Sequence, residues 1–362
     1  MSLPTPLEPG GRPLVSVVIP TLDENADIAG CIQALGEQDH PLGAIEVILV
    51  DGCSADGTAA VAQMAADDFA FAAFTVVASP RRRTSISLNL GLEHARGAYV
   101  VRVDARARVP ADYVRTCVEI LDSEPTVGVV GGAQTPQARS TRLGDRGIAR
   151  ALNNRLATGL SRYRRSTTSG PADTVWMGAF RTADLRAVGG WPEDLAISED
   201  WELNHRYRTS GAVVWFAAGL SSGYLPRTSF GRLARQYFAF GRGKGTSWVG
   251  GTRPEVRQVA LVAGPLLGLV ALLALVRRVG PAALFVAPAG YVVVDHLGSV
   301  RPGTLAERGA SATAIAVFTG AWWVGVVVGG LGGVVHRSAV DASGQSAGVP
   351  SNIGSAPRTA PR

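Results

Sequence analysis

The sequence predicts an α/β domain built on a Rossmann-like, mostly parallel sheet, followed by C-terminal transmembrane helices. Three observations support this fold class. Short apolar segments alternate with helical segments up to about residue 130, two of the apolar segments stop on a single carboxylate, and long uncharged segments follow residue 257. The 362 residues are enough for one large or two ordinary domains.

The strands and helices of the first domain are expected to alternate. Each expected strand is a short run rich in Val, Ile or Leu, and Gly57 and Pro110 precede two of the helices. The expected strands are residues 14–19, 45–50, 75–78, 99–103 and 127–130, and the expected helices are residues 26–35, 58–66, 85–95 and 111–121. This βαβα order favours parallel strands with helices on both faces of the sheet.

Three uncharged segments follow this domain, at residues 259–276, 279–294 and 309–335. A helix over the first would be ~27 Å long and over the third ~40 Å, against a hydrocarbon core of ~30 Å, so we expect both to span. The second is short and contains Pro281 and Pro288, so a kinked span, a re-entrant hairpin and an interfacial piece all stay open. We therefore assign two or three transmembrane helices to residues 257–335.

The flanking segments differ from the domains that they border. Residues 1–13 and 336–362 are rich in Pro, Gly, Ser or Ala, and we expect both to be disordered. Residues 229–245 place apolar side chains at helical spacing with arginine on the other side, which favours a helix in the membrane interface. Ordinary packing on the first domain is the alternative.

The compartment follows from two further observations. No apolar signal segment is visible near the N-terminus, and Cys31, Cys53 and Cys117 show no CxxC spacing. We therefore expect a multi-pass protein of the cell membrane (the inner or plasma membrane) whose first domain lies in the cytoplasm, a reducing compartment.

Arginine dominates the net charge of +6, and residues 139–165 hold eight arginines against one acid, Asp145. Arg142, Arg146 and Arg150 recur every four residues, so a helix would align them on one side. Such a row suits phosphates or an anionic membrane surface, and a solvated helix face is the alternative.

Two predicted strands stop on a lone acid, Asp51 and Asp104. Parallel sheets bind ligands in the crevice beyond the carboxyl ends of their strands, so both acids are candidate site residues. Asp51 is needed for neither the cap nor the turn that follows, which leaves it free to accept a hydrogen bond from a ligand. Asp104 suits a hard cation such as Mg²⁺ or Mn²⁺.

A third acidic element packs Glu199, Asp200 and Glu202 into four residues among apolar neighbours. Like charges so close raise the pKa of at least one carboxyl, as a general base requires. A solvated helix start is the alternative.

Taken in order, these motifs resemble a family 2 glycosyltransferase of the GT-A fold. The matching segments are PTLDEN (20–25), VDGCSADGT (50–58), NLGLEHARG (89–97), the strand end at Asp104 and the pair Glu199-Asp200. The resemblance covers residues 14–245. The pattern is similar to membrane-anchored glucosyltransferases of succinoglycan-type exopolysaccharide assembly, where Arg-Val-Asp-Ala precedes a non-acidic residue and Gln-Tyr-Phe precedes the spans.

The resemblance implies roles by position. It implies a donor site formed by Pro20, Thr21, Glu24, Asp51, Asn89, Asp104 and Arg106. Within it, Thr21, Glu24 and Asp51 would hold the nucleoside, and Asp104 would coordinate the Mg²⁺ or Mn²⁺ that bridges the diphosphate. Asp200 would be the base that deprotonates the acceptor, supported by Glu199. The acceptor-side loop would contain Trp176, Met177 and Gly178.

The implied reaction is an inverting transfer of a sugar, expected to come from a UDP-hexose, to a lipid-linked saccharide in exopolysaccharide or cell-envelope glycan synthesis. The expected partners are the nucleotide-sugar donor, the lipid-linked acceptor, the membrane and other glycan-assembly proteins, with no nucleic acid. Two alternatives stay open: a synthase that loads one sugar onto polyprenyl phosphate, and a catalytically degenerate membrane scaffold.

The chain departs from the family pattern at the metal motif and elsewhere. The usual Asp-x-Asp reads Asp104-Ala105-Arg106, so Arg106 could contact the diphosphate and reduce the reliance on metal. The usual paired acid after the second strand is Asp51-Gly52. Gln236-Tyr237-Phe238 only half resembles the motif of processive polysaccharide synthases.

Other nucleotide-binding classes are disfavoured. The first strand is followed by Pro20-Thr21-Leu22 rather than by the glycine-rich turn of a dinucleotide oxidoreductase. Gly243-Lys244-Gly245 lacks the Ser or Thr after Lys and the earlier Gly of a phosphate-binding P-loop.

Overall fold

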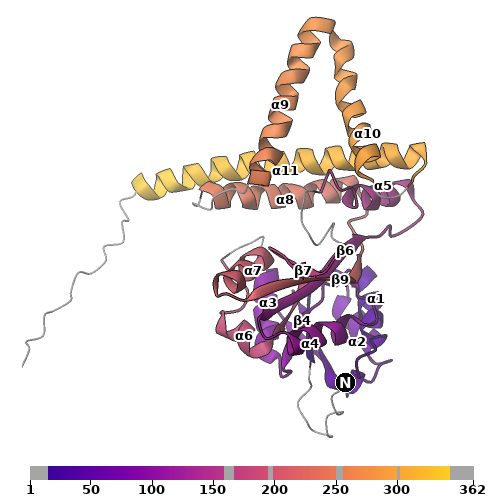
Figure 1. The fold of residues 1–362 in the computed structure, drawn as a ribbon, viewed down its shortest axis with the longest axis vertical. Helices are drawn as coiled ribbons and strands as arrows, with labels where there is room; N and C mark the ends of the chain where they lie inside the picture. Colours follow the sequence, from indigo (N-terminus) through magenta and orange to yellow (C-terminus); the bar gives the residue numbers. More distant parts are fainter. Residues whose placement is uncertain (1–14, 159–166, 195–198, 250–255, 300–301, 343–362) are drawn as a thin grey trace, which may run out of the picture.

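The computed structural model describes residues 15–158, 167–194, 199–249, 256–299 and 302–342. Figure 1 shows an α/β domain, a layer of helices over one end of it, and a helical hairpin that projects away from this layer. The expected disordered segments 1–13 and 343–362 lie outside the described residues. Residues 336–342, which were also expected to be disordered, belong to the last helix.

The first half of the domain has the predicted alternation. Four strands lie side by side in the order β3-β2-β1-β4 and are all parallel. The strands are β1 (Val15–Thr21), β2 (Ile45–Asp51), β3 (Ala73–Ala78) and β4 (Tyr99–Arg102), and the helices are α1 (Asn25–Gly36), α2 (Thr58–Ala66), α3 (Thr84–His94) and α4 (Tyr113–Ser123). A 3₁₀ turn, η1 (Leu42–Ala44), precedes β2. Strands β1 and β2 are almost wholly buried, which is why they read as unbroken apolar segments.

The second half contains both parallel and antiparallel pairs, so the sheet as a whole is mixed. The prediction of a mostly parallel sheet is wrong for this half. Strand β8 (Trp176–Arg181) pairs antiparallel with both β4 and β6 (Val127–Pro136), while β9 (Val213–Tyr224) pairs parallel with β6. The short strands β5 (Ala107–Arg108) and β7 (Gly170–Pro171) pair antiparallel with β9. Residues 170–224 lack the regular helix-strand alternation from which parallel pairing was inferred.

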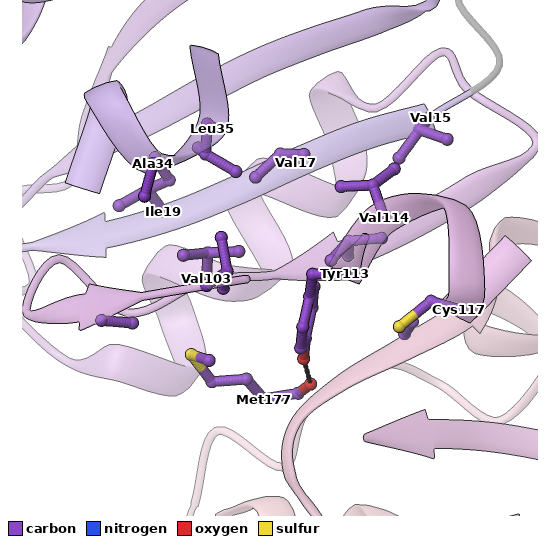
Figure 2. Close-up of a cluster of buried hydrophobic side chains, with 14 of the residues drawn as sticks. Val15, Val17, Ile19, Ala34, Leu35, Val103, Tyr113, Val114, Cys117 and Met177 are labelled. Carbon is purple, nitrogen blue, oxygen red and sulfur yellow. Dashed lines mark hydrogen bonds between the residues drawn. The ribbon is translucent and has the colours of Figure 1, made fainter. Parts of the chain in front are cut away.

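The core lies on both faces of the sheet. One cluster joins β1 and β2 to α1 and α4, and the other joins the opposite face to α3 and to Trp191 and Tyr207. Figure 2 shows side chains of β1, α1 and α4 from the first cluster, together with Val103, which follows β4, and Met177. There, the fully buried Tyr113 hydroxyl donates to the backbone carbonyl of Met177 at 2.6 Å. This bond ties α4 to the segment beside Asp104.

The remaining helices extend the domain and form the layer above it. Helix α6 (Thr182–Ala187) follows β8, and α7 (Glu199–Thr209) begins with the predicted acidic pair. The layer consists of α5 (Leu143–Leu152), α8 (Phe230–Val249) and α11 (Leu305–Ala342), as Figure 1 shows. The hairpin consists of α9 (Val256–Val279), the 3₁₀ helix η3 (Pro281–Phe285) and α10 (Val286–Gly298).

Among the described residues, one helix is long and apolar enough to cross a membrane, over Leu305–Gly332. This segment contains most of the third predicted span, residues 309–335. The first predicted span lies within α9, and the second is divided among the end of α9, η3 and α10. The division falls at Gly280 and Pro281, next to one of the two prolines that made the second segment ambiguous.

The arginine row does not form an open anion-binding face. Arg146 pairs with Glu307 at the start of α11, and Arg150 pairs with the fully buried Asp295 of α10. Two of the three aligned arginines therefore bind acids of the C-terminal helices. The row joins α5 to α10 and α11.

Candidate functional site

A cavity of about 430 Å³ lies beyond the carboxyl ends of β1 and β4, where the sequence predicted the site. Its lining includes five arginines and three carboxylates. These are Arg82, Arg83, Arg102, Arg106 and Arg227, with Glu24, Asp104 and Glu199. The described lining is therefore cationic overall, which suits an anionic ligand.

One end of the cavity is organised by Arg102, the last residue of β4. Its side chain is only 7% exposed, and its Nε donates to Asp104 at 2.9 Å. Its Nη1 donates to Asp200 and lies 3.6 Å from Glu199. A single buried guanidinium therefore holds Asp104 together with the adjacent acids Glu199 and Asp200, which lie almost 100 residues further along the chain. We call this set the Arg102 cluster.

The Arg102 cluster shifts the pKa values of its members. Burial, together with the carboxylates of Glu199 and Asp104, raises the pKa of Asp200 to about 7, although Arg102 opposes the shift. Burial lowers the pKa of Arg102, but Asp104, Asp200 and Glu199 outweigh it, so the net shift is upward. Arg102 therefore stays charged while Asp200 can exchange a proton near neutral pH. The Trp191 indole also donates to Asp200, at 3.3 Å.

The Asp104 carboxylate lines the cavity and is 29% exposed. Its backbone is held by Met177, whose Sδ accepts a hydrogen bond from the Asp104 amide at 3.3 Å. Met177 has a φ of 52°, which is uncommon for a residue other than glycine. Among the described residues, no group of three or more His, Cys, Asp or Glu is placed to hold a metal ion.

The other end of the cavity carries a second set of opposite charges, the Arg106 cluster, formed by Arg106, Glu24 and Arg227, which also line an adjoining cavity whose described lining does not include the Arg102 cluster. Arg106 Nε lies 3.3 Å from the Glu24 carboxylate, and Arg227 lies 3.9 Å from the same oxygen. The Arg106 guanidinium also stacks over Tyr224 at 5.6 Å. Burial raises the pKa of Glu24, and the two arginines oppose that shift. Here two cations share one acid, the reverse of the Arg102 cluster.

Two buried polar atoms at this end have no protein partner in the described structure, Thr21 Oγ1 and Arg106 Nη1. Both residues line the cavity. Burying a donor or acceptor without a partner is unfavourable. A ligand that forms hydrogen bonds with these two atoms would therefore bind more tightly.

Comparison with known proteins agrees with this geometry. Residues 16–184 match the family model described as "Glycosyl transferase family 2". The chain is 31% identical over 313 residues to the succinoglycan biosynthesis protein ExoA of Rhizobium meliloti (strain 1021). The alignment covers 84% of this chain and 93% of that protein. The chain belongs to glycosyltransferase family 2. It is therefore a transferase enzyme, as the resemblance implied.

Two further matches are more distant. A Methanococcus voltae protein, dolichyl N-acetyl-alpha-D-glucosaminyl phosphate 3-beta-D-2,3-diacetamido-2,3-dideoxy-beta-D-glucuronosyltransferase, is 23% identical over 236 residues, 64% of this chain and 73% of that protein. The solved mannosyltransferase PcManGT from Pyrobaculum calidifontis, in complex with GDP-Man and Mn²⁺, matches with a TM-score of 0.53 at 23% identity. That match covers 88% of this chain and 87% of that one, and it shows a GT-A-like fold.

The glycosyltransferase brings together most of the residues that its sequence pointed to. The cavity lining contains seven of the predicted site residues, namely Pro20, Thr21, Glu24, Asp104, Arg106, Trp176 and Glu199. Asp200 lies behind them, bound to Arg102.

Asp51 is not free, contrary to the sequence argument. Its carboxylate accepts hydrogen bonds from the backbone amide of Ser54 at 3.0 Å and from the Ser54 hydroxyl at 2.5 Å. It is buried and is not part of the described cavity lining, whereas its neighbour Gly52 is. The acid closes the loop after β2, a turn-forming role that aspartate often has.

Three other predicted site residues have packing roles. The Asn89 amide donates to the backbone carbonyl of Trp191 at 2.8 Å and accepts from the Trp191 amide at the same distance. Met177 is buried in the core, and Gly178 packs against the ring of Phe180. Asn89, Met177 and Gly178 lie outside the described lining and support the residues that form it.

The sequence argument missed Arg102 and the contribution of α8. A charged residue inside an otherwise apolar strand signals a buried ion pair, and Arg102 shares a face with Asp104 because the two are two residues apart. Gln236 and Phe240 of α8 also line the cavity. They are four residues apart and therefore lie on one face of the helix. The sequence prediction for this helix rested on its apolar stripe, so this face was not assigned to the site.

Proposed function

We propose that this glycosyltransferase transfers a sugar, with inversion, from a nucleotide-sugar donor, expected to be a UDP-hexose, to a lipid-linked saccharide acceptor in the membrane. The observation that carries the proposal is the division of the cavity into an acid-rich end at Arg102 and a base-rich end at Arg106. An inverting displacement needs a base on one face of the sugar and a stabilised leaving group on the other.

Asp200 is the proposed base. Its raised pKa lets it take the proton of the acceptor hydroxyl near neutral pH, while the acceptor oxygen forms a bond to the anomeric carbon. The bond between that carbon and the diphosphate breaks, and the nucleoside diphosphate leaves with the electron pair. Arg102 holds Asp200 and also pairs with Glu199, and Trp176 of the cavity lining is assigned to the acceptor side.

The diphosphate is assigned to the Arg106 cluster. Arg106 and Arg227 already share one acid, and Arg82 and Arg83 add positive charge to the same cavity. Charge-assisted hydrogen bonds from guanidinium groups suit phosphate oxygens and would offset the charge of the leaving group. The nucleoside is assigned to Pro20, Thr21 and Glu24 at the end of β1, where Thr21 Oγ1 lacks a protein partner.

A divalent metal fits one carboxylate of the cavity. Asp104 is exposed to the cavity, and Mg²⁺ or Mn²⁺ is commonly held by one or two carboxylates with substrate phosphate oxygens and water. When bound, such an ion would neutralise diphosphate charge beside Asp104. Arg106 occupies the motif position of a second acid, so we propose that the guanidinium shares this task with the metal.

We further propose that the enzyme is a multi-pass protein of the cell membrane with its catalytic domain in the cytoplasm, where sugar nucleotides are available. The apolar C-terminal helices and the 31% identity to a succinoglycan biosynthesis protein favour a membrane acceptor and exopolysaccharide or cell-envelope glycan synthesis, in which other glycan-assembly proteins would be partners. For this division we keep the domain boundaries proposed from the sequence, 14–245 for catalysis and 257–335 for the membrane.

The test is a screen of radiolabelled sugar nucleotides with membranes that contain the protein, with label counted in the lipid fraction. Transfer to lipid-linked oligosaccharide supports the proposal. Transfer to polyprenyl phosphate alone would support the second candidate, a lipid-linked monosaccharide synthase. That candidate is favoured by a 107-residue match, at 32% identity, to an undecaprenyl-phosphate 4-deoxy-4-formamido-L-arabinose transferase of Pseudomonas paraeruginosa. The absence of transfer and of uridine diphosphate binding, with or without Mn²⁺, would support the degenerate scaffold.

A further inference from the structure

Helices α8 and α11 are in direct backbone contact. An added Cβ on Gly241 or Gly245 of α8 would overlap backbone carbonyl oxygens of α11, and one on Gly325 or Gly329 of α11 would overlap those of α8. Each pair is spaced four residues apart, the small-xxx-small pattern that lets helices pack closely. The partners advance together along both helices, so α8 and α11 run parallel.

Further contacts extend this pairing along the helices. Leu233 packs with Ile315 and Phe318, and the Tyr237 ring stacks on Phe318 with centroids 4.8 Å apart. The apolar stripe of α8, expected from the sequence to face the membrane, is therefore covered by α11 and α5. Helices α8 and α11 form one unit, which we call the helix platform.

The other face of α8 lies on the catalytic domain. Gln236 and Phe240 line the cavity, and the Lys244 ammonium lies over the Trp201 ring of α7 at 5.6 Å. These three residues follow one another every four positions, on a single helix face. Helix α8 therefore contacts the catalytic domain on one face and α11 on the other. A change in the orientation of α11 would require α8 to move with it.

The base of the hairpin is fixed to the platform. Asp295 near the end of α10 is fully buried and accepts three hydrogen bonds of 3.0–3.1 Å from Arg150 of α5. Asn154 donates to the backbone carbonyls of Val294 and Asp295. On the other arm, the Trp323 indole donates to the carbonyl of Val262 in α9 at 3.2 Å. The hairpin therefore leaves the platform and returns to it.

The rest of the hairpin projects away from the platform (Figure 1). Its arms expose large apolar side chains that have little other cover, including Leu267, Val270, Leu273, Val293 and Leu297. Beyond Val262, α9 projects by ~26 Å, and η3 with α10 up to Val293 projects by ~22 Å. A helix layer in the interface already lies ~5–10 Å into the boundary between headgroups and acyl chains, so a hairpin of this length is sufficient for a hydrocarbon core of ~30 Å.

The position of α11 conflicts with its composition. It passes the length and hydropathy test for a span, yet it is paired side by side with α8, which carries the exposed residues Arg232, Arg235 and Arg242. If α11 crossed the bilayer, its parallel partner would draw these charges into hydrocarbon, where charged side chains are strongly disfavoured.

We propose that the bilayer is crossed only by the α9–α10 hairpin and that the helix platform lies in the plane of the membrane surface. The exposed Val324, Val327 and Leu331 of α11 then face acyl chains, and the arginines of α8 face headgroups. Arg277 and Arg278 at the far end of α9 reach the opposite headgroup layer. An even number of crossings places the end of α11 on the same side as the catalytic cavity, which α8 brings to the membrane surface. The inference rests on the proposed membrane location.

Cysteine accessibility in sealed vesicles of both orientations tests this topology. Cys53 is exposed and marks the catalytic side, while Cys31 and Cys117 are buried. In a Cys53→Ser background, Ala342→Cys should react with a membrane-impermeant maleimide from the side on which Cys53 reacts in the parent, and Gly280→Cys from the opposite side. Labelling of Ala342→Cys from the side opposite to Cys53 would show that α11 crosses. Labelling of Gly280→Cys from the Cys53 side, or a chain in the soluble fraction, would also overturn the proposal.

These outcomes do not depend on turnover, so they separate the topology from the proposed reaction. A matched pair of variants tests the platform. Gly325→Leu should lower the turnover at least tenfold, because it separates α11 from the helix that carries Gln236 and Phe240. Gly320→Leu lies on an open face of the same helix, where an added Cβ meets no atom within 4 Å, and it should stay within twofold of the parent. Equal effects of the two variants would contradict the pairing.

Discussion

The Arg102 and Arg106 clusters lie at two ends of one cavity and have opposite charge balances. Arg102 is one cation among three carboxylates, whereas Arg106 and Arg227 share a single carboxylate, Glu24. The two arginines are only four residues apart in the chain, on either side of Asp104. The difference indicates that five residues at the end of β4 and just after it, 102–106, contribute to both the acid-rich and the base-rich end of the site.

The largest effect should come from breaking the acid-rich end at Asp200. Asp200→Asn removes the proposed base and should lower kcat by roughly 10²–10⁴-fold. Donor affinity should be retained, because the diphosphate is assigned to the other cluster. Steady-state kinetics and calorimetric titration with the donor measure the two quantities.

Glu202→Gln is the matched control for Asp200. Glu202 is on the same helix and pairs with Arg206 rather than with Arg102. It should keep near-parent turnover. Full turnover of Asp200→Asn would remove Asp200 from the role of base.

Arg102→Met tests whether one cation holds the acid-rich end together. Removing one partner of a buried ion pair costs about 3–5 kcal/mol, and here three carboxylates would lose a common partner. We expect the free energy of unfolding in denaturant titrations to fall by that order. Arg115→Met, on an exposed pair with Asp39 and Glu119, should cost less than about 1 kcal/mol. Equal costs for the two variants would mean that the Arg102 cluster is not a structural centre.

Arg106→Gln tests the base-rich end. Loss of a charge-assisted hydrogen bond to the diphosphate corresponds to about 1.5–3 kcal/mol, or a roughly 10- to 100-fold rise in the donor KM. The kcat at saturating donor should change much less. A rise in metal requirement would follow if Arg106 shares the diphosphate charge with the ion at Asp104, and titration of Mn²⁺ measures it. An unchanged donor KM would contradict the assignment.

The pH dependence of kcat/KM tests the acid-rich end without any substitution. Asp200 acts as a base only when deprotonated, and its raised pKa of about 7 means that activity is lost as the pH falls through that value. The kcat/KM should therefore fall about tenfold per pH unit below roughly pH 7. A limb near pH 4, the ordinary range of an aspartate, would show that the Arg102 cluster does not raise this pKa.

Much of this could be predicted from the sequence, and the failures share physical causes. The parallel half of the sheet was predictable because buried strands such as β2 are continuous apolar runs between helical segments. The mixed half was not, because β8 pairs with β4 and β9 pairs with β6 through contacts distant in the chain. Asp104 and Asp200 were predicted from motif position, and the structure brings both to Arg102. Asp51 was predicted to be free for a ligand, but its carboxylate binds Ser54 in the loop after β2. The strand pattern does not reveal such a local hydrogen bond.

The membrane part shows the same limit. The length and hydropathy of residues 309–335 predict a span, but glycine contacts with α8 decide where the helix lies. Composition reports how apolar a helix is, whereas its orientation depends on its packing partners.

The most direct test of the divided cavity is a crossed measurement of kcat and donor dissociation constant in Asp200→Asn and Arg106→Gln. The account predicts opposite results: Asp200→Asn loses kcat and keeps donor affinity, while Arg106→Gln loses donor affinity and keeps most of kcat. If both variants lose the same quantity, the two ends do not have separate roles and the account is wrong.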